Sequence, residues 1–591
     1  MNMVTSMILR RMRTPFLLLI SVYAIAILGM VLIPGVDDQG NAWRMSFFHA
    51  FYFVSFTATT IGFGEIPYAL TDAQRLWALV TVYSTVIAWF YALGKILGLI
   101  QDKAFKQAVT QHRFKRDIQK LHQPFYLICG FGETGNAMVN SLTEEHYRTV
   151  VVEYDEENLN RLNLNELKEY VPSIAGDASE PHILELAGIR HPMCQGVIAV
   201  TASDETNLKI AITSKLLHPD IKVACRSEFK DIEENMLSFG TDQVVNPYET
   251  FAEIFGMLTH STSLHLINDW LTGAPNTRLS DPVYLTEGPW ILCGYGRFGR
   301  ELYKHLQSKN ISTVVIDPNK SLKEEFDLNE DENRFIIGTG TDQKTLMQAG
   351  IQSAAGLIAG SDNDSNNLSI IMTALEINEK VFCIARQNKW NNHILYHSLE
   401  DQHKSADNPI NFLIMHPREI IARKIRTFFL TPLLDRFLGI ARQQSCEWSN
   451  IMISRLSAIV GDSRPHVWSA TINKKTAPAV TQSLRYGRII TISHLTQDPG
   501  DRNAKLRCVP LLLIREGQEI LLPDDDLEIK IGDELLFCGT HQVKDNMHWT
   551  LRVMRSLNYV MSFRDEPESY IWRLYYHYRN TSERRKRTRK K

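Results

Sequence analysis

The sequence predicts an α-helical membrane domain with two spans and a re-entrant helix, followed by two α/β Rossmann-like domains and a small α+β domain. Three observations support this fold class. Two long apolar stretches lie within the first 100 residues, a glycine-rich strand–loop–helix pattern occurs twice in the middle of the chain, and short runs rich in Ile and Val follow it. A chain of 591 residues is long enough for several such domains.

Composition limits the class of partner and the compartment. The chain is 44% hydrophobic and 22% charged, ordinary proportions for a mostly soluble protein, and its formal net charge is −2. A nearly neutral chain gives no reason to expect a nucleic-acid partner. The 8 cysteines form no Cys-x-x-Cys pair and several lie in apolar runs, which favours buried thiols in a reducing compartment over disulfides or zinc.

Two membrane spans are predicted. Residues 15–34 carry no charge, and a helix of that length spans roughly 30 Å, the thickness of the hydrocarbon core of a lipid bilayer. A signal peptide would have a shorter apolar region and a small-residue cleavage site. The second stretch, residues 76–100, holds one charge, Lys95, near its end, where it can snorkel to the headgroups. Basic residues before the first span and after the second place both termini in the cytoplasm of a multi-pass plasma-membrane protein.

The segment between the spans is predicted to re-enter the membrane. Residues 42–57 are aromatic and apolar but too short to span, and they lead into the sequence TATTIGFGE, from Thr57 to Glu65. Alternating glycines allow successive carbonyl groups to point the same way. Non-helical backbone at membrane depth is tolerated only inside protein or along a water-filled path. The pattern therefore predicts a homotetramer around an axis, in which rings of carbonyl oxygens replace the hydration shell of K⁺.

This stretch resembles the selectivity-filter signature of potassium channels, T-x-x-T-x-G-[YF]-G-[DE]. Phe63 stands in the aromatic position, and Glu65 stands where Asp is commoner. The resemblance implies that K⁺ is bound by backbone carbonyls and that the flanking residues support them. The implied filter residues are Thr60, Ile61, Gly62, Phe63 and Gly64, with K⁺ bound by the carbonyls of the first four and with Thr59 and Glu65 as supporting residues.

The second span is predicted to line the cavity beneath the filter. Gly94 and Gly98 are candidate positions for a gate hinge, and close helix packing through small residues is an equally good interpretation of both. The sequence has no repeat of arginine at every third position, so voltage is not the expected stimulus.

A Rossmann-like fingerprint begins after Pro124. A short apolar run, residues 125–129, leads to Gly130, Gly132 and Gly135, then to a helical pattern and a second strand that is followed by Glu153. In this fold the glycines allow a tight turn and the close approach of a pyrophosphate to a helix N-terminus. The acid accepts hydrogen bonds from a ribose. The pattern therefore predicts a dinucleotide-binding cleft.

The same pattern recurs about 160 residues later. The second copy has Gly294, Gly296 and Gly299 after the apolar residues 290–293, and its second strand is followed by Asp317. Later turns and strands recur in the same order. The sequence therefore predicts two α/β domains in tandem.

The two predicted clefts differ in charge. Arg297 lies within the second glycine loop and adds positive charge where a phosphate would sit, whereas Glu133 at the matching position of the first loop would repel a phosphate unless it faces solvent. The first copy instead keeps Asp177 where the second has Thr339. We expect NAD(H) or an adenine nucleotide, ADP or ATP, at the second site, because the strand-end acid favours a 2′-hydroxyl over a 2′-phosphate. At the first site, a bound nucleotide and a fold kept only for structure are open alternatives.

Both copies resemble RCK domains, the regulators of K⁺ conductance that are also called TrkA-N domains. The first copy carries a Gly-Asp-Ala-x turn at residues 176–179 and the sequence Asp-Glu-x-Asn-Leu after the fourth strand, at residues 204–208. The chain as a whole resembles a prokaryotic two-span potassium channel with tandem RCK domains. The resemblance implies a K⁺-selective channel, not an enzyme, that a nucleotide controls through a cytoplasmic ring of eight RCK domains. It also implies that residues 449–541 form a small RCK-C (TrkA-C) domain.

Two other functions are weighed against the channel. One is a membrane-anchored NAD-dependent oxidoreductase, but the sequence has no evident substrate domain and no acid–base residue placed beside a nicotinamide. The other is a regulatory subunit of a K⁺ transporter, but such subunits are typically soluble, and here the predicted pore is in the same chain.

Three further features have structural interpretations. The acids at positions 524–526 could bind Ca²⁺, but a turn explains them equally well. For residues 362–364, helix capping is favoured over a calcium site. The basic tail, residues 584–591, is predicted to be disordered, with attraction to anionic lipid as the alternative.

The chain is predicted to consist of eight parts. They are the membrane pore domain (1–100), a helical linker (101–123), the first Rossmann-like domain (124–248), a helical connector (249–287), the second Rossmann-like domain (288–411), a second helical connector (412–448), the RCK-C domain (449–541) and the C-terminal segment (542–591).

Overall fold

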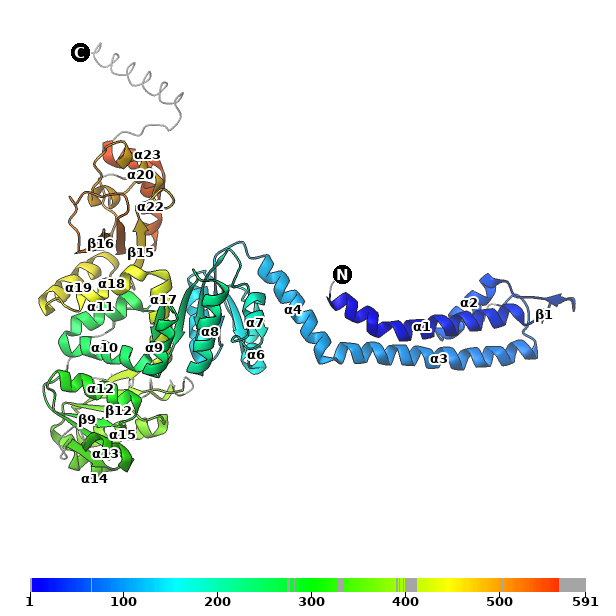
Figure 1. Cartoon of the computed structure of the whole chain (residues 1–591), viewed down its shortest axis with the longest axis horizontal. Helices are drawn as coiled ribbons and strands as arrows, with labels where there is room; N and C mark the ends of the chain where they lie inside the picture. The colour runs from blue at the N-terminus through cyan, green and yellow to red at the C-terminus, as the bar shows by residue number, and fades with distance from the viewer. Residues whose placement is uncertain are drawn as a thin grey trace, which may run out of the picture. The chain divides into compact units, whose positions relative to one another are not determined.

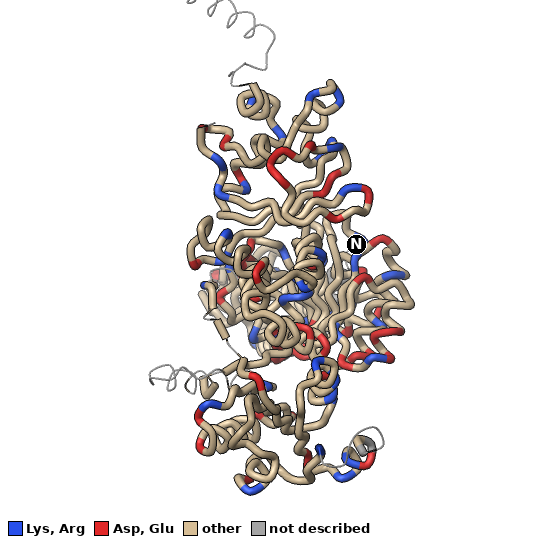
Figure 2. The backbone as a smooth tube through the Cα atoms, turned by 90° about the vertical axis from the view of Figure 1, so that its left-hand side faces the viewer, with Lys and Arg blue, Asp and Glu red and all other residues tan. Residues whose placement is uncertain are grey.

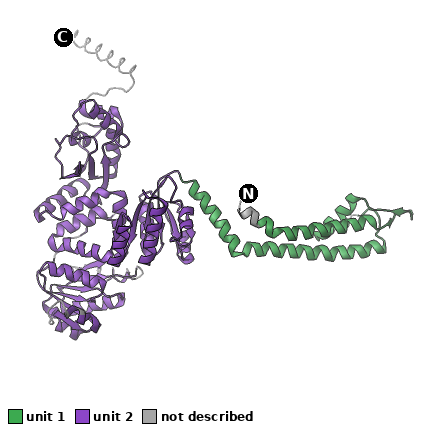
Figure 3. Cartoon of the chain, viewed as in Figure 1, with its two compact units in different colours: residues 1–121 green, residues 122–591 purple. Residues whose placement is uncertain are grey.

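The computed structural model describes residues 3–64, 66–273, 277–280, 282–283, 285–327, 334–389, 392, 394–396, 398, 412–501 and 503–562. The chain forms two compact units, residues 1–121 and 122–591 (Figure 3). Glu65, one of the predicted filter-supporting residues, and the basic tail, residues 584–591, lie outside the described residues.

The first unit contains two long helices, a short helix between them and a helical linker (Figure 1). The helices are α1 Met3–Leu32, α2 Phe47–Ala58, α3 Asp72–Gln101 and α4 Lys103–Gln119, and the short strands β1 Gly35–Val36 and β2 Ala42–Trp43 pair between α1 and α2. Ile8–Leu32 and Asp72–Gln101 are long and apolar enough to cross a membrane, with mean hydropathies of 2.5 and 1.7. The predicted pair of long apolar helices is thus confirmed.

Helices α1 and α3 pack closely because Gly29 leaves room for an indole ring. A Cβ atom on Gly29 would lie 2.0 Å from the ring of Trp77, and the Nε1 of that ring donates to the Ala26 carbonyl at 3.1 Å. Farther along α3, Trp89 donates to the hydroxyl of Tyr23, also at 3.1 Å. These contacts join the two apolar helices into one bundle.

A break in the helix separates α3 from α4. The polar, helical character of residues 101–123 predicts a helical linker that continues the second span, and the structure has a helix there, but α3 ends at Gln101 before it. Asp102 has an extended backbone (φ −64°, ψ 124°), and its side chain caps α4 by accepting from the Phe105 amide at 3.1 Å. Its carboxylate also pairs with Arg11 of α1. The helix breaks here because Asp favours a cap over a helix interior.

Two six-stranded parallel sheets form most of the second unit. Their strand orders are β5-β4-β3-β6-β7-β8 and β11-β10-β9-β12-β13-β14, and each neighbouring pair is parallel. The first sheet has β3 Phe125–Cys129, β4 Arg148–Glu153, β5 Ser173–Ala175, β6 Cys194–Ala199, β7 Lys222–Arg226 and β8 Gln243–Val245. The second has β9 Trp290–Cys293, β10 Thr313–Asp317, β11 Phe335–Ile337, β12 Gly356–Ala359, β13 Phe382–Arg386 and β14 Phe412–Met415. The two predicted Rossmann-like folds are confirmed.

The crossover helices of the two sheets follow the same plan. The first domain has α5 Glu133–Glu144, α6 Glu156–Leu164, α7 Pro181–Leu186, α8 Asp204–Leu217 and α9 Lys230–Ser238. The second has α12 Arg297–Ser308, α13 Lys320–Asp327, α14 Gln343–Gln348, the 3₁₀ helix η2 Ile351–Ser353 and α15 Asp364–Ile377. The central strands β3 and β9 each lead through a glycine loop into the next helix, α5 or α12.

The helix that follows each sheet packs on the other sheet's domain. Helix α10 Pro247–His260 follows the first sheet, yet Phe251 and Phe255 belong to the same buried cluster as Phe298 of the second domain. Helix α17 Pro417–Leu430 follows the second sheet, yet Ile425 belongs to the buried cluster of the first domain. We call α10 and α17 the exchanged helices. The helical connectors were predicted, but this exchange was not.

The C-terminal part of the second unit is a small α+β domain, as predicted. Its antiparallel sheet has the order β15-β18-β16-β17, with β15 His466–Thr471, β16 Cys508–Arg515, β17 Gln518–Leu521 and β18 Glu534–Gly539. The accompanying helices are α11 Thr262–Thr272, α18 Pro432–Ala441, α19 Cys446–Val460, α20 Pro478–Arg485, α21 Ile492–Leu495, α22 His541–Arg552 and α23 Met554–Ser562. One apolar cluster joins the sheet to α11, α18 and α19, and a second joins it to α20 and α22.

The calcium alternative for residues 524–526 has no support in the structure. The Asp524 carbonyl accepts from the Leu527 amide at 3.1 Å, a bond that forms a turn, as the alternative interpretation expects. Asp525 pairs with Lys505 at 2.6 Å. Within the described part of the chain, no group of three or more His, Cys, Asp or Glu side chains is arranged to hold a metal ion. Acidic and basic positions are interspersed over the second unit (Figure 2), in keeping with the small net charge.

Candidate pore and nucleotide clefts

The predicted filter begins at the C-terminal end of α2. Thr59 caps this helix, and both its amide and its hydroxyl donate to the Ser55 carbonyl, at 3.1 and 2.8 Å. The amides of Ile61 and Gly62 donate to the Phe56 carbonyl at 3.0 and 3.2 Å. These bonds tie the filter segment to the last turn of α2, whose negative dipole end favours a cation nearby.

The backbone of the filter segment alternates in conformation. Thr60, Gly62 and Gly64 have φ values of 61°, 65° and 73°, in the left-handed region, while Ile61 and Phe63 between them do not. Alternation of this kind lets successive carbonyls face one side. The sequence predicts the left-handed conformation at the two glycines. The left-handed conformation of Thr60 was not predicted, because a residue with a Cβ atom rarely adopts it. That these carbonyls bind K⁺ stays a prediction.

The two candidate hinge glycines lie within an unbroken helix. Helix α3 runs through both Gly94 and Gly98, and apart from the backbone of the helix no atom lies within 4 Å of where their Cβ atoms would be. Neither glycine is therefore needed for packing within the first unit. Their role as a hinge stays a prediction.

The two glycine loops have nearly the same geometry. The first glycines, Gly130 and Gly294, have φ values of 99° and 102°, at which any residue with a Cβ atom would be strained. A Cβ atom on Gly135 would lie 2.0 Å from the Gly130 carbonyl oxygen, and one on Gly299 would lie 2.0 Å from that of Gly294. The middle glycines, at positions 132 and 296, cap α5 and α12, and a Cβ atom there would meet nothing within 4 Å. The loops thus leave open space at each helix N-terminus.

The strand-end acids hold the glycine loops in place. Glu153 accepts from the Phe131 amide of its loop and from the Asp155 amide at 2.9 Å. Asp317 accepts from the Tyr295 amide at 2.7 Å and from the amide two residues beyond it at 2.9 Å. Both carboxylates are buried. Each has lone pairs left for a ribose hydroxyl, so the predicted ribose contact stays a prediction beside this structural role.

The other predicted polar residues of the first cleft have local partners. Asp177 accepts from the Ser179 amide at 2.8 Å within its turn. Glu133, at the start of α5, pairs with Arg418 at the start of the exchanged helix α17. The carboxylate is thereby neutralised, so its repulsion of a phosphate is weaker than its position in the sequence indicates.

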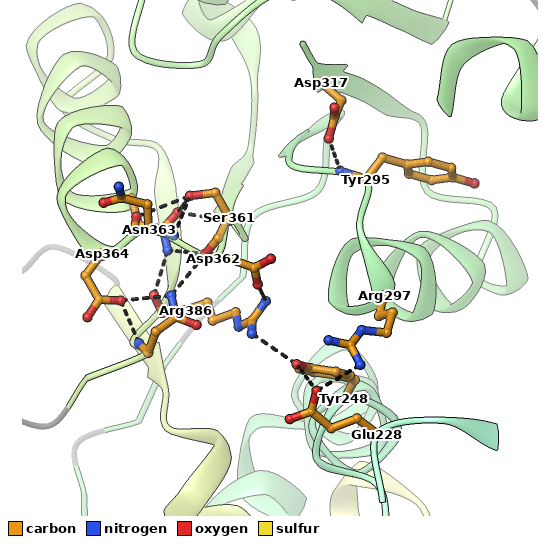
Figure 4. Close-up of polar contacts among 12 residues, drawn as sticks. Glu228, Tyr248, Tyr295, Arg297, Asp317, Ser361, Asp362, Asn363, Asp364 and Arg386 are labelled. Atoms are coloured by element: carbon orange, nitrogen blue, oxygen red, sulfur yellow. Dashed lines mark hydrogen bonds and ion pairs between the residues drawn. The ribbon is translucent and has the colours of Figure 1, made fainter. Parts of the chain in front are cut away.

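Arg297 also has a partner, but in the other Rossmann-like domain. Its guanidinium lies 3.0 Å from a carboxylate oxygen of Glu228, which follows β7 in the first domain (Figure 4). It also lies over the rings of Phe229 and Tyr248, at 4.6 and 5.7 Å from the ring centroids. In Figure 4 the side chain points toward Glu228 and away from Asp317. The predicted contact with a phosphate stays a prediction.

Glu228 is the centre of a polar network between the two domains. It pairs with Arg226 of its own domain, and the Tyr248 hydroxyl donates to it at 3.2 Å. Arg386, at the end of β13, donates to the same hydroxyl at 3.0 Å (Figure 4). Burial alone would raise the pKa of Glu228, but the two arginines and the hydroxyl outweigh it and hold the pKa below its usual value. We call Glu228, Tyr248, Arg297 and Arg386 the interdomain network.

Sequence reasoning missed this network, although one signal was visible. Arg226 and Arg386 end the equivalent strands β7 and β13, so the repeat carries an arginine at the same position twice. The repeated acids Asp204 and Asp364 have structural roles, since each accepts backbone amides from the segment after that strand. The capping prediction is confirmed at Asn363, which accepts from two amides at the start of α15.

Comparison with known proteins agrees with this architecture. The family model described as "Ion channel" matches residues 16–102, and the model described as "TrkA-N domain" matches residues 126–247 and 290–403. "Potassium channel protein 1" of Methanocaldococcus jannaschii is 28% identical over 205 residues, which are 34% of this chain and 59% of the relative. "Probable potassium channel protein 2" of the same organism is 28% identical over 207 residues, 34% of this chain and 58% of the relative. The matches therefore span less than two thirds of either relative.

A solved structure of the "GsuK channel bound to NAD" is similar to 93% of this chain and 100% of that chain, with 16% identity and a TM-score of 0.45. The family matches include the two apolar helices with the filter segment and both glycine loops. The chain therefore carries a region that matches the ion-channel family, followed by two regions in tandem that match the TrkA-N domain family.

Proposed function

We propose that the protein is a K⁺-selective channel whose opening is controlled by NAD(H), ADP or ATP bound to its TrkA-N domains. The observation that carries this proposal is the backbone of residues 60–64, where left-handed conformations alternate at Thr60, Gly62 and Gly64 directly after a short helix between two apolar helices. A filter of this kind needs several chains around one axis. The working assembly is a homotetramer with eight TrkA-N domains, in the plasma membrane, with both termini in the cytoplasm.

The glycine loops supply the proposed sensor. Each leaves open space at the N-terminus of its helix, where amide groups and the helix dipole favour a phosphate. The second cleft is the stronger candidate because Arg297 begins α12, and Asp317 ends the strand beside it. The protein performs no catalysis in this proposal, since the ligand acts by binding one conformation more tightly than another.

The chain connects the sensor directly to the pore. Helix α4 follows α3 after the single residue Asp102, and only residues 120–124 lie between α4 and β3. A ligand-dependent displacement of the first TrkA-N domain is therefore transmitted to the inner helix through a short, mostly helical segment. The working states of the pore differ by the position of α3 at its cytoplasmic end.

The test is K⁺ flux from liposomes that contain the purified protein, with and without NAD⁺, NADH, ADP and ATP. We expect a flux that Ba²⁺ blocks, that excludes Na⁺ and that at least one nucleotide changes. Gly62→Ala should abolish this flux and leave nucleotide binding unchanged, because Ala is strained at a φ of 65°. Flux that survives in Gly62→Ala would refute the filter. Absence of flux under all conditions would favour a regulatory subunit of a K⁺ transporter.

A further inference from the structure

The interdomain network places a carboxylate of one TrkA-N domain on the arginine of the other domain's glycine loop. Glu228 follows β7 of the first domain, and Arg297 is the first residue of α12 in the second. The two side chains meet at 3.0 Å. We propose that Glu228 and the phosphate of a bound nucleotide compete for Arg297, so that occupancy of the second cleft releases this contact between the domains. This inference rests on the proposed nucleotide function.

Arg297 is placed so that it can change partners. Its side chain is 46% exposed, whereas that of Glu228 is 17% exposed. A partly exposed ion pair contributes little to stability, so a phosphate at the start of α12 can displace it. A Cβ atom on the preceding Gly296 would meet nothing within 4 Å, so there is open space beside Arg297 for a phosphate. The mobile partner in this pair is therefore the arginine.

Glu228 is fixed where it is and does not follow Arg297. Arg226 and the Tyr248 hydroxyl hold its carboxylate, and its amide donates to Asp204 at 2.6 Å. Tyr248 is held in turn by Arg386, which pairs with Asp362 at 2.6 Å. Loss of Arg297 therefore leaves the carboxylate paired within its own domain, and only the tie to the second glycine loop is released.

Competition, and not joint binding, follows from the charges. In Figure 4 Arg297 points toward Glu228, while Asp317 and Tyr295 lie on the other side of the loop. A phosphate close enough to share the guanidinium would also lie close to the Glu228 carboxylate and would be repelled by it. The ligand class is thus a nucleotide that carries phosphate. A nucleoside without phosphate gives no reason for Arg297 to leave Glu228.

The first cleft provides an internal contrast. At the position of Arg297 it has Glu133, and the partner of that residue on the exchanged helix is Arg418. The charges are reversed, so a phosphate in the first cleft is repelled by the loop residue and attracted by its partner. In the first cleft the glycine loop carries the carboxylate, so a phosphate there would not draw a loop arginine away from the other domain.

Two conclusions follow for regulation. A nucleotide in the second cleft weakens one contact between the TrkA-N domains and so favours arrangements in which they are less tightly joined. By thermodynamic reciprocity, any state that holds Glu228 on Arg297 binds the nucleotide less tightly.

The experiment measures binding of ADP and of adenosine by calorimetry to the full-length protein and to Glu228→Gln. The amide keeps the shape of the side chain and removes its charge. We expect the Kd for ADP to fall about two- to fivefold, the range for a charge near a helix N-terminus, while the Kd for adenosine is unchanged. In the double variant Glu228→Gln/Arg297→Gln the gain for ADP should disappear, which a merely structural role of Glu228 does not predict.

Glu253→Gln is the matched control, because Glu253 pairs with Arg442 at 3.0 Å and not with Arg297. Its Kd for ADP should equal that of the wild type. An unchanged or higher Kd for ADP in Glu228→Gln refutes the competition, as does an equal gain for adenosine. Should Glu228→Gln melt at a lower temperature, Glu228→Asp, which shortens the reach to Arg297, is expected to give a gain in the same direction. No ADP binding in any variant refutes the proposed nucleotide function itself, and with it this inference.

Discussion

Two glycines of the second loop are predicted to have separate roles, Gly299 in stability and Gly296 in ligand binding. A Cβ atom on residue 299 would lie 2.0 Å from the Gly294 carbonyl oxygen and 3.0 Å from its carbon. On residue 296 a Cβ atom would meet nothing within 4 Å, and the backbone φ of −73° suits any residue. We predict that Gly299→Ala destabilises the second TrkA-N domain, whereas Gly296→Ala keeps its stability and weakens nucleotide binding.

The expected loss of stability follows from two opposing effects. To relieve the contact with the Gly294 oxygen, α12 and the loop must separate by about 1 Å, and overpacking of this kind costs about 1–3 kcal/mol. Alanine in place of glycine within a helix returns about 0.5–1 kcal/mol. The net loss is about 1–2 kcal/mol, and at about 2–4 °C per kcal/mol it lowers the melting temperature by roughly 2–8 °C.

The assay is thermal unfolding of the full-length protein in detergent, followed by calorimetry with ADP. Gly299→Ala should melt earlier than the wild type. Gly296→Ala should melt with the wild type and bind ADP more weakly, because the added methyl group occupies the open space at the start of α12. Wild-type melting of Gly299→Ala would refute the packing argument. Wild-type ADP affinity of Gly296→Ala would show that the nucleotide does not approach this glycine.

Two further predictions concern the second unit. Arg426 is buried and donates to the Thr272 and Gly273 carbonyls. Arg426→Met should therefore lower the midpoint of urea unfolding by the equivalent of about 2–4 kcal/mol. The control is Arg442→Met, which removes an exposed ion pair, and an equal effect of that substitution would contradict the prediction. Burial, with the nearby charges of Lys544 and His541, lowers the pKa of His466 to about 4. Because this pKa lies below the unfolded value of about 6.5, protonation of His466 favours the unfolded chain. The free energy of unfolding is therefore highest above pH 6.5 and decreases as the pH falls toward 4. The melting temperature of the wild type should fall more steeply across that window than that of His466→Phe, and equal slopes would exclude His466 as the cause.

Local patterns predicted the local parts of the site. The alternation of glycines in residues 60–64 predicts a backbone with left-handed conformations, and the glycine spacing after β3 and β9 predicts two tight turns into helices. These features depend on the conformational freedom of single residues, so the sequence carries them directly.

Contacts between distant segments could not be predicted in the same way. The sequence marks Arg297 as a charge beside a glycine loop, but its partner Glu228 lies 69 positions earlier, and nothing in either segment indicates the other. The strand-end acids were expected to face a ribose, yet Glu153 and Asp317 also accept amides of their own loops, because a buried carboxylate needs donors at close range. The apolar faces of α10 and α17 require burial, but an apolar pattern does not say which sheet provides it.

The exchanged helices have a consequence for synthesis of the protein. The first sheet is complete once residue 245 has left the ribosome, but Ile421 and Ile425, which cover part of its core, are made about 180 residues later. At a ribosomal rate of about 5–20 residues per second, this face stays uncovered for roughly ten to forty seconds. The emerging chain therefore carries an apolar surface that needs a temporary partner, and translation that stops between the two copies leaves a product that cannot complete either core.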